Sequence, residues 1–526
     1  MRLLRGRLVR GATLSLLLIC QAQGHARSTA IEESVPPHGD TIVASRHNVK
    51  LDDGRAIKYT AYAGLLPLYV NDTGERMASV FFVAYIADAK VPRNDRPITF
   101  LWNGGPGSNS AQINAAGFGP KRIVTADTMP EYKPGPQTAM SDNGETLLGT
   151  SDLVFIDPVG TGFSRATSEK YRDILYTSRG DAEAVAEAIR IFMNRYNRWN
   201  SPLFIAGESY GTIRAGLVAD MLERRREHVS GVLMISGMLD LGPDVPANLA
   251  AALKLADMAA PAYYHGTMAP DLLALTQDAA VKKAEVFART VYAPALDRLA
   301  TLSPAERAQV ISGIVRFVGI KEKFIDPKTL LVDPAVFADN LLADKGFELG
   351  RYDSRMKMPH RAAGESWSPL TDASLAPMVD LLEGTSPLFN GYIRNELGFK
   401  SDLFYRGPFG KEFHPEPLSS APDTGYGGDW MAAMFKWDAA GFAPREDQPL
   451  RRAMRANPKL RVFSMLGLYD GNCVGRREEI ARIADDLKSR VSSACYVGGH
   501  MFYSDRKARE QVQRDFADFV QARPER

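Results

Sequence analysis

The 526-residue sequence contains little cysteine, little net charge and, beyond its N-terminus, no apolar run long enough to span a bilayer. No stable membrane span is therefore expected. The three cysteines allow one disulfide at most. A formal net charge of +2 provides no basic field for nucleic acid, so no nucleic-acid partner is expected either. The 45% hydrophobic and 24% charged residues are ordinary for a globular protein. Nothing in the sequence indicates an oligomeric state.

The N-terminus has the pattern of a secretory signal peptide. Four arginines precede the apolar run 11–20, and small residues follow, with Gly24 and Ala26 at positions typical of cleavage. We expect residues 1–26 to be removed near Ala26 and residues 27–40 to form a linker. The protein would then be exported, either to the periplasm or as a secreted protein. Losing the four arginines would change its formal charge from +2 to −2.

Apolar runs typical of buried strands alternate with helical patterns along most of the chain. Antiparallel strands are expected first, over residues 47–87, where two turn sequences separate β-like runs. Strands alternating with helices then imply parallel crossovers and an α/β fold. We assign residues 41–239 and 442–526 to this core. Its later strands are expected near 97–102, 152–156, 202–206, 231–235, 460–466 and 493–497.

Residues 240–441 interrupt this alternation. They are rich in Ala, Leu, Pro and Met, with helical patterns near 249–258, 280–298 and 306–318. Because a structureless loop of this length is implausible in a folded domain, we expect a mostly helical insertion. Insertions over the carboxyl ends of strands usually shape a substrate pocket, so this one would determine which substrate side chains are accepted.

A Gly-Glu-Ser-Tyr-Gly pentapeptide at 207–211 follows the expected strand at 202–206 and precedes a helical pattern. This arrangement is typical of a nucleophile elbow, in which a sharp turn leaves a serine exposed above a sheet. Ser209 is therefore the candidate nucleophile. The alternative is a strand-to-helix turn that contains an inert serine.

A serine nucleophile needs a histidine base and an orienting carboxylate, and in this fold they occur in the order Ser, acid, His. Five histidines follow Ser209. His500 is the candidate base because it lies in a Gly-Gly-His sequence just after the last expected strand; the alternative is a histidine of a surface loop. The other four come too early or lack a strand-end context: His228, His265, His360 and His414.

Asp470 is the candidate acid because it lies at the carboxyl end of the expected strand at 460–466. An aspartate that only caps a turn is the alternative reading of this residue. Asp485 and Asp486 are less suitable, since they fall in a charged helical segment.

The developing oxyanion needs backbone donors. The glycine-rich loop that follows the strand expected at 97–102 suggests the Gly105 N–H, together with the N–H of Tyr210 directly after the nucleophile. Taken alone, such a loop is an ordinary turn.

Four motifs resemble the serine carboxypeptidases, peptidase family S10. They are the Trp-Asn-Gly-Gly-Pro-Gly-Ser loop at 102–108, the segment 152–164, the elbow at 207–211 and the Gly-Gly-His at 498–500. The resemblance covers most of residues 80–240 and 458–505 and indicates a bacterial-type exported member. It implies an α/β-hydrolase fold with the helical insertion as a cap. It also implies release of C-terminal residues from a peptide substrate at acidic pH, through an acyl-enzyme on Ser209, with no cofactor and no metal.

In that family an asparagine and a glutamate, here Asn103 and Glu208, hold the free carboxylate of the substrate. A carboxylate can bind beside Glu208 only if Glu208 is protonated, which favours low pH. The sequence departs from the family at Gly117, where a second glutamate usually partners the first. Strict exopeptidase specificity is then in doubt unless Gln112 or another side chain substitutes. Ser108 also replaces a cysteine of many relatives, which removes one familiar disulfide.

Two other functions compete with this interpretation. An esterase or acyltransferase would use the same three residues, and relatives could make that change by altering the carboxylate site. A catalytically silent binding protein is the other possibility, and the complete set of Ser, Asp and His argues against it.

Cys473 and Cys495 are the cysteines that remain after cleavage, three residues after Asp470 and five residues before His500. In an exported protein they form a candidate disulfide that would tether the two catalytic loops. The alternative is a pair of separate buried thiols.

Overall fold

The computed structural model describes residues 41–522 except 90, 91, 93, 124–139, 240, 243, 244, 363 and 409–447. The expected signal peptide with its cleavage site near Ala26, the linker at 27–40 and His414 therefore lie outside the described residues. Among the helices that the structure describes, none combines the length and the apolar character that a membrane crossing needs.

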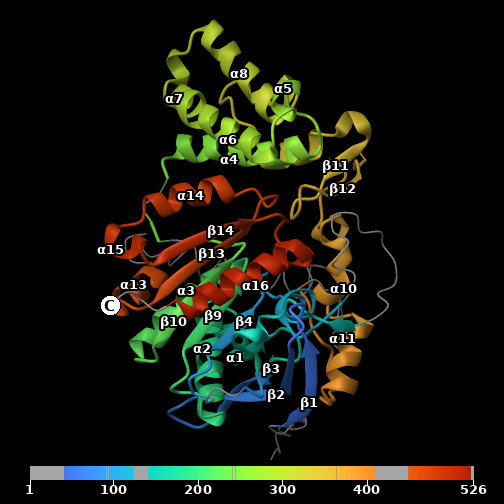
Figure 1. Ribbon diagram of the computed structural model, residues 1–526, viewed down its shortest axis with the longest axis vertical. Coiled ribbons are helices and arrows are strands. Elements are labelled where there is room, and N and C mark those ends of the chain that lie inside the picture. Colours follow the sequence, from blue (N-terminus) through green and yellow to red (C-terminus); the bar gives the residue numbers. More distant parts are fainter. Residues whose placement is uncertain are drawn as a thin grey trace, which may run out of the picture. The chain divides into compact units, whose positions relative to one another are not determined.

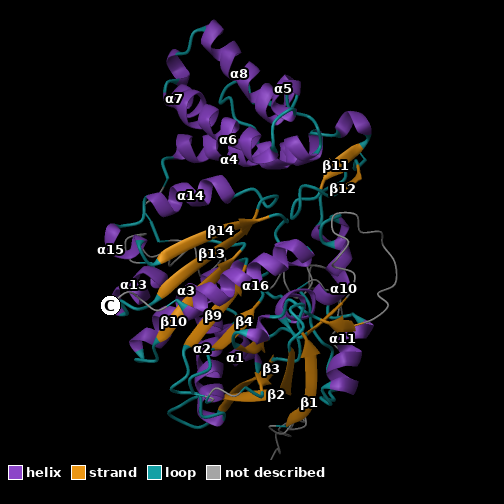
Figure 2. Cartoon of the chain, in the orientation of Figure 1, coloured by secondary structure: helices purple, strands orange, loops and turns teal. Residues whose placement is uncertain are grey.

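The described core is built on a large mixed sheet (Figures 1 and 2). The first strands pair antiparallel as far as β7, and every pair from β7 to β14 is parallel. The short strand β8 (Arg165–Ala166) pairs with β3 outside the main order. That order is β1 (Ile42–Lys50), β2 (Ala56–Tyr69), β3 (Arg76–Ala87), β7 (Asp152–Ile156), β4 (Ile98–Trp102), β9 (Leu203–Glu208), β10 (Val229–Ile235), β13 (Arg461–Gly467) and β14 (Val491–Tyr496).

The strand order identifies the fold. β4 precedes β7 in the chain but lies between β7 and β9 in the sheet. From β9 onward each strand is added in parallel on the same side, through crossovers that carry helices. A sheet with this exchange, antiparallel at its beginning and parallel through its later strands, is that of an α/β-hydrolase, which confirms the expected fold class.

The central strands are mostly apolar because helices cover both faces of the sheet. All residues of β4, β7 and β9 are buried. Since side chains alternate along a strand, Phe100 and Trp102 pack in one apolar cluster, whereas Leu101 packs in the other. The first cluster includes residues of α2 (Ser178–Arg195), α3 (Tyr210–Arg224) and α13 (Pro449–Ala456), and the second includes residues of α16 (Arg506–Gln521).

Between β10 and α13 the described residues are mostly helical and have an apolar cluster of their own. Helix α8 shows why local sequence favours helices here: Ser303 and Glu306 form a capping box, Pro304 begins the helix, and the left-handed Gly319 ends it. A hairpin that periodicity did not predict, β11 (Phe347–Leu349) and β12 (Lys357–Pro359), interrupts the helices. The helices are α4 (Ala247–Tyr264), α5 (Pro270–Leu273), α6 (Gln277–Phe287), α7 (Ala293–Asp297), α8 (Pro304–Val318), α9 (Pro334–Asn340), α10 (Val379–Leu382) and α11 (Pro387–Gly391).

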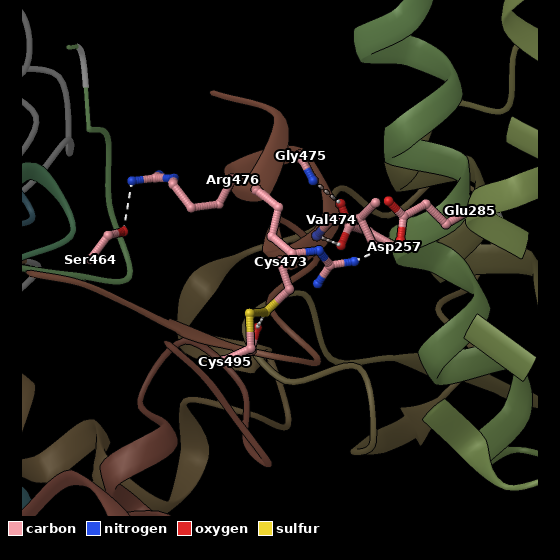
Figure 3. The surroundings of a disulfide bond; sticks show 10 residues. Asp257, Glu285, Ser464, Cys473, Val474, Gly475, Arg476 and Cys495 are labelled. Atoms are coloured by element: carbon pink, nitrogen blue, oxygen red, sulfur yellow. Dashed lines mark hydrogen bonds and ion pairs between the residues drawn. A yellow bond between two sulfur atoms is a disulfide. The ribbon is translucent and has the colours of Figure 1, made fainter. Parts of the chain in front are cut away.

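Helix α14 (Cys473–Ala481) lies beside α4 and connects it with the sheet (Figures 1 and 3). Cys473, the first residue of α14, is bonded to Cys495 of β14, with 6.0 Å between the Cα atoms. This is the pairing expected from the sequence. The bond joins the segment that follows Asp470 to the strand that leads to His500.

Asp257 of α4 caps the N-terminus of α14 (Figure 3). Its carboxylate accepts hydrogen bonds from the Val474 N–H at 2.8 Å and the Gly475 N–H at 3.4 Å. Burial raises the pKa of Asp257 to about 6, against the two N–H groups and nearby positive charges, which favour its ionised form. A second contact between the insertion and α14 is the ion pair of Glu285, on α6, with Arg477, on α14, at 2.9 Å.

Replacing both cysteines by serine, C473S/C495S, should lower the free energy of unfolding by about 3 kcal/mol. The bond links residues 22 positions apart, so it restricts the unfolded chain more than the folded one. Denaturant unfolding of the variant and the wild type measures the difference. Each single serine variant should lose about as much as the double variant, because either change removes the whole bond. Equal stability of wild type and double variant would contradict this account.

Candidate active site

Ser209 lies in the turn between β9 and α3 with φ 57° and ψ −125°, a conformation that residues other than glycine rarely adopt. Glycines make the turn possible. A Cβ on Gly207 would collide with the Gly211 carbonyl oxygen, and one on Gly211 would lie 2.9 Å from the Trp102 ring. Buried strand β9 ends directly before the serine and α3 begins directly after it, which is the geometry of a nucleophile elbow.

Asp470 and His500 follow the neighbouring parallel strands β13 and β14, and the structure brings their side chains together. His500 Nδ1 and Asp470 Oδ2 are 3.0 Å apart, and both side chains are largely buried. Burial lowers the pKa of His500, but the charge and hydrogen bond of Asp470 and the charge of Glu208 outweigh it, so the net shift is upward. Asp470 therefore orients the imidazole and stabilises its protonated form.

The end of β10 connects Ser209 with the histidine loop. The Ser209 N–H donates to the Ile235 carbonyl at 2.9 Å, and the Ser236 hydroxyl donates to the His500 carbonyl at 2.6 Å. Within the described part of the chain no hydrogen bond joins Ser209 Oγ to the His500 ring. Contacts between nucleophile and base often tighten only when substrate binds, and this one stays a prediction.

The loop after β4 closely approaches the elbow. A Cβ on Gly104 would lie 2.6 Å from the Tyr210 nitrogen, and Gly105 has a φ of 99°. Trp102 Nε1 donates to the Gly211 carbonyl at 2.9 Å, which fastens the loop to α3. The two backbone segments that carry the expected oxyanion donors, the N–H groups of Gly105 and Tyr210, are therefore in contact.

A buried ion pair supports this loop. Arg214 of α3 lies 2.6 Å from Asp181 of α2, with both side chains inaccessible to solvent, and donates to the Asn103 carbonyl at 2.8 Å. Burial raises the pKa of Asp181, and the positive charge of Arg214 opposes that shift. Because either charge would be costly to bury alone, the pair fixes the loop to both helices.

Glu208, directly before the serine, is a buried acceptor. Its Oε2 accepts hydrogen bonds from Asn103 Nδ2 at 2.6 Å and from the Tyr503 hydroxyl at 2.7 Å. Asn103 Oδ1 in turn accepts from the Ile113 N–H at 3.0 Å, which fixes the direction of the amide. Burial raises the pKa of Glu208 to about 7, although the charge of His500 and the two donors oppose the shift. Glu208 can therefore exchange a proton near neutral pH.

Tyr503 is a residue of the site that sequence reasoning missed. Its ring lies over Gly117, where an added Cβ would be 3.0 Å from the ring carbon Cδ2. Gln112, considered as a substitute for the absent second acid, instead hydrogen-bonds a methionine sulfur at 3.7 Å. The available signal was an aromatic residue three positions after His500. Only the fold shows that its hydroxyl reaches Glu208.

The helical insertion also contributes to the site, through the loop between β11 and β12. The Tyr352 carbonyl accepts a hydrogen bond from the His500 N–H at 2.5 Å. The Tyr352 ring packs edge-on against the His500 imidazole, with 5.4 Å between centroids. Ser354 donates to the Tyr469 carbonyl from its N–H at 3.2 Å and from its hydroxyl at 2.9 Å. One loop therefore contacts the segments that carry both the acid and the base.

Two cavities flank Asp470. One of about 300 Å³ is lined in part by Met258 and Phe337 of the insertion. The other, of about 520 Å³, includes Met238 and Lys254. Both cavities thus combine groups of the catalytic loops with groups that follow β10.

A possible metal-binding group lies elsewhere. The carboxylates of Asp52, Glu145 and Glu510 are close enough to hold an ion. Arg506 contacts all three, at 2.9, 3.1 and 3.3 Å. Because Arg506, together with Arg509 at 3.7 Å from Glu145, offsets much of this negative charge, the group is an ion-pair network, and none of its members is a candidate site residue.

Comparisons with known proteins agree with the motifs. Residues 55–285 match the sequence model described as serine carboxypeptidase. Serine carboxypeptidase-like 44 of Arabidopsis thaliana is 28% identical over 214 residues, 38% of this chain and 40% of that protein. Pheromone-processing carboxypeptidase kex1 of Aspergillus niger is 30% identical over 145 residues, 27% of this chain and 21% of that protein. A solved structure of the prohormone-processing carboxypeptidase Kex1 of Saccharomyces cerevisiae is 13% identical, covering 88% of this chain and 91% of its own, with a TM-score of 0.48.

The chain spans 40% and 28% of the lengths of the first two curated relatives that it matches. The family match includes the Gly-rich loop and the elbow, whereas Asp470 and His500 lie beyond it. The matched motifs occupy the positions that an α/β-hydrolase sheet gives to an oxyanion loop and a nucleophile. Residues 55–285 of this chain are therefore similar to the serine carboxypeptidase family.

Proposed function

We propose that this protein is a serine-type carboxypeptidase that releases C-terminal residues from peptides through an acyl-enzyme on Ser209. The observation that carries the proposal is a buried carboxyl group, Glu208, directly beside the strained serine and electrostatically coupled to His500. An ordinary esterase has no need of a buried acid that titrates near neutral pH at this place.

In the acylation step, Ser209 Oγ attacks the carbonyl carbon of the last peptide bond while His500 Nε2 takes its proton. Asp470 accepts the Nδ1–H of His500, which fixes the tautomer and stabilises the imidazolium. The N–H groups of Gly105 and Tyr210 stabilise the oxyanion. When the C–N bond breaks, His500 returns the proton to the leaving amine.

Deacylation repeats these steps with water as the nucleophile. His500 takes a proton from the water, whose oxygen adds to the acyl carbon. The tetrahedral intermediate then collapses, the C–O bond to Ser209 breaks, and His500 returns the proton to Oγ. Deacylation releases the peptide shortened by one residue and regenerates the Ser209 hydroxyl.

Substrate selection follows from the acid beside the serine. A peptide carboxylate next to ionised Glu208 would be repelled, whereas protonated Glu208 and Asn103 can both donate hydrogen bonds to it. Protonating Glu208 also removes one of the charges that raise the pKa of His500, so the base loses its proton more easily. Binding of the C-terminus and a neutral base therefore favour the same state of Glu208.

An esterase or acyltransferase is the second candidate, and Gly117 is the observation that favours it. The site has one acid where the family usually has two, so its selectivity for free carboxylates depends on groups other than a second glutamate. A comparison of free-acid peptides with amides and esters decides between the two functions.

We further propose that the chain is exported, with cleavage near Ala26, to the periplasm or as a secreted protein. The arginine-rich, apolar N-terminus and the Cys473–Cys495 bond support this. We also propose a division into core residues 41–239 and 442–526 and a cap at 240–441. The cap would supply the walls of the substrate side-chain pockets.

Ser209→Ala should lower kcat by several orders of magnitude and abolish labelling by a fluorophosphonate probe, because both need the same hydroxyl. His500→Ala should lower kcat by a similar factor, and the double variant should lose little more, because the two residues act as a unit. Ser493→Ala, a change on an exposed part of β14, is the matched control and should retain both activity and label. Full activity of Ser209→Ala would refute the assignment.

For a peptide with a free C-terminal carboxylate, kcat/KM should fall as pH rises through the pKa of Glu208, about 7, because the ionised acid repels the substrate. The matching C-terminal amide should show no fall there. Glu208→Gln should flatten the profile of the free acid and spare ester hydrolysis, since the amide stays neutral and still donates. Equal losses on both substrates at every pH would instead indicate a structural role for Glu208.

A further inference from the structure

The proposed function assigns the substrate carboxylate to Glu208 and Asn103, but it does not say what orients the acid. We propose that Tyr503 is a positioning residue that confines the proton of Glu208 to one oxygen, Oε1, and thereby makes the site selective for a free C-terminal carboxylate. This inference rests on the proposed carboxypeptidase function and deepens it.

Two donors converge on a single oxygen of Glu208. The Tyr503 hydroxyl and Asn103 Nδ2 lie 2.7 and 2.6 Å from Oε2. The amide cannot turn over without cost, since its oxygen already accepts from the Ile113 N–H at 3.0 Å. A proton on Oε2 would point at donors, so the neutral acid carries its proton on Oε1. Oε1 is then the oxygen that can donate to a substrate carboxylate.

Tyr503 is itself held rigidly. Its side chain is inaccessible to solvent, its ring packs over Gly117, and the Phe118 ring lies 5.1 Å away between centroids. The Tyr503 carbonyl accepts from Arg509 Nη1 at 2.9 Å. Burial and the charge of Glu208 raise the pKa of Tyr503 well above its usual range. The phenol therefore keeps its proton and serves as a donor throughout the pH range of the enzyme.

The glycine at position 117 makes room for this arrangement. A side chain there would press on the ring, since a Cβ alone would lie 3.0 Å from Tyr503 Cδ2. The hydroxyl therefore reaches Glu208 from a segment 295 residues away while the edge of its ring packs against Gly117. Gly117 and Tyr503 act together: one provides the space, and the other provides the donor.

The sign of the effect on Glu208 follows from the groups that face it. His500, Tyr503 and Asn103 favour its ionised form, whereas burial and the charge of Asp470 favour its neutral form. Removing the phenol therefore raises the pKa of Glu208 further. A hydrogen bond to a charged group corresponds to about one pH unit or somewhat more.

The test is Tyr503→Phe, which keeps the ring and removes the donor. For a blocked dipeptide with a free carboxylate, the alkaline fall of kcat/KM should move up by about one pH unit. At low pH the KM for this substrate should rise about tenfold, because the proton is no longer confined to Oε1. The matching C-terminal amide and a simple ester should keep their kcat/KM within about twofold, since they do not use the acid.

Two further variants keep the result interpretable. Gly117→Ala presses on the ring without removing the hydroxyl, and it should shift the free-acid profile in the same direction by a smaller amount. Tyr496→Phe is the matched control: its hydroxyl bonds Asp515 at 2.8 Å, so neither substrate class should change.

The positioning role would be overturned if the alkaline fall of kcat/KM for the free acid did not move in Tyr503→Phe. It would also be overturned if kcat/KM fell equally for the free acid, the amide and the ester. Labelling of Ser209 by a fluorophosphonate separates this from failure of the proposed function. If the wild type labels and cleaves esters but does not cleave free-acid peptides, the carboxypeptidase assignment is wrong, and this inference is overturned with it.

Discussion

The turn at Ser209 is the constraint on which the rest of the site depends. A serine with φ 57° persists only where both flanking elements are held in place. β9 is held between β4 and β10 in a fully buried part of the sheet, and α3 is tied to α2 by the Arg214–Asp181 pair. Gly207 and Gly211 lack side chains, so the turn can close tightly and Gly211 can pack against the Trp102 ring. Strain at one residue is thereby balanced by the packing of several elements.

Polar groups next to this turn form a connected, buried series. Asp181 holds Arg214, Arg214 holds the carbonyl of Asn103, and the Asn103 amide donates to Glu208, which Tyr503 also contacts. In a medium of low polarity each of these hydrogen bonds is stronger than in water, and each unpaired group would be more costly. The series therefore links the position of the oxyanion loop to the proton affinity of the acid beside the nucleophile.

The insertion contacts both segments that carry the candidate acid and base. Asp257 caps the helix that begins just after Asp470, and the loop with Tyr352 and Ser354 bonds to the backbone on both sides of the acid–base pair. The Cys473–Cys495 bond joins the same two segments from the sheet side. The placement of His500 beside Asp470 therefore depends on contacts from the insertion as well as on the sheet.

Sequence patterns alone predict the α/β-hydrolase class and nominate a nucleophile, an acid and a base. The fold class follows from apolar runs alternating with helical periodicity. Ser209 follows from a local Gly-x-Ser-x-Gly pattern, and Asp470 and His500 follow from their order and from strand ends that parallel pairing brings to one edge. A local motif and the order of residues along the chain are enough to predict a residue whose position follows from a single turn or strand end.

The side chains that support these candidate residues could be identified only from the packing of the folded chain. Tyr503 meets Glu208 across 295 positions, and the β11–β12 loop meets His500 from within an insertion whose periodicity did not predict a hairpin. Gln112 seemed a possible partner for Glu208 by its position in the chain, yet it points to a methionine. Contacts of this kind depend on how separate layers pack against one another. Neither periodicity nor spacing along the chain records that packing.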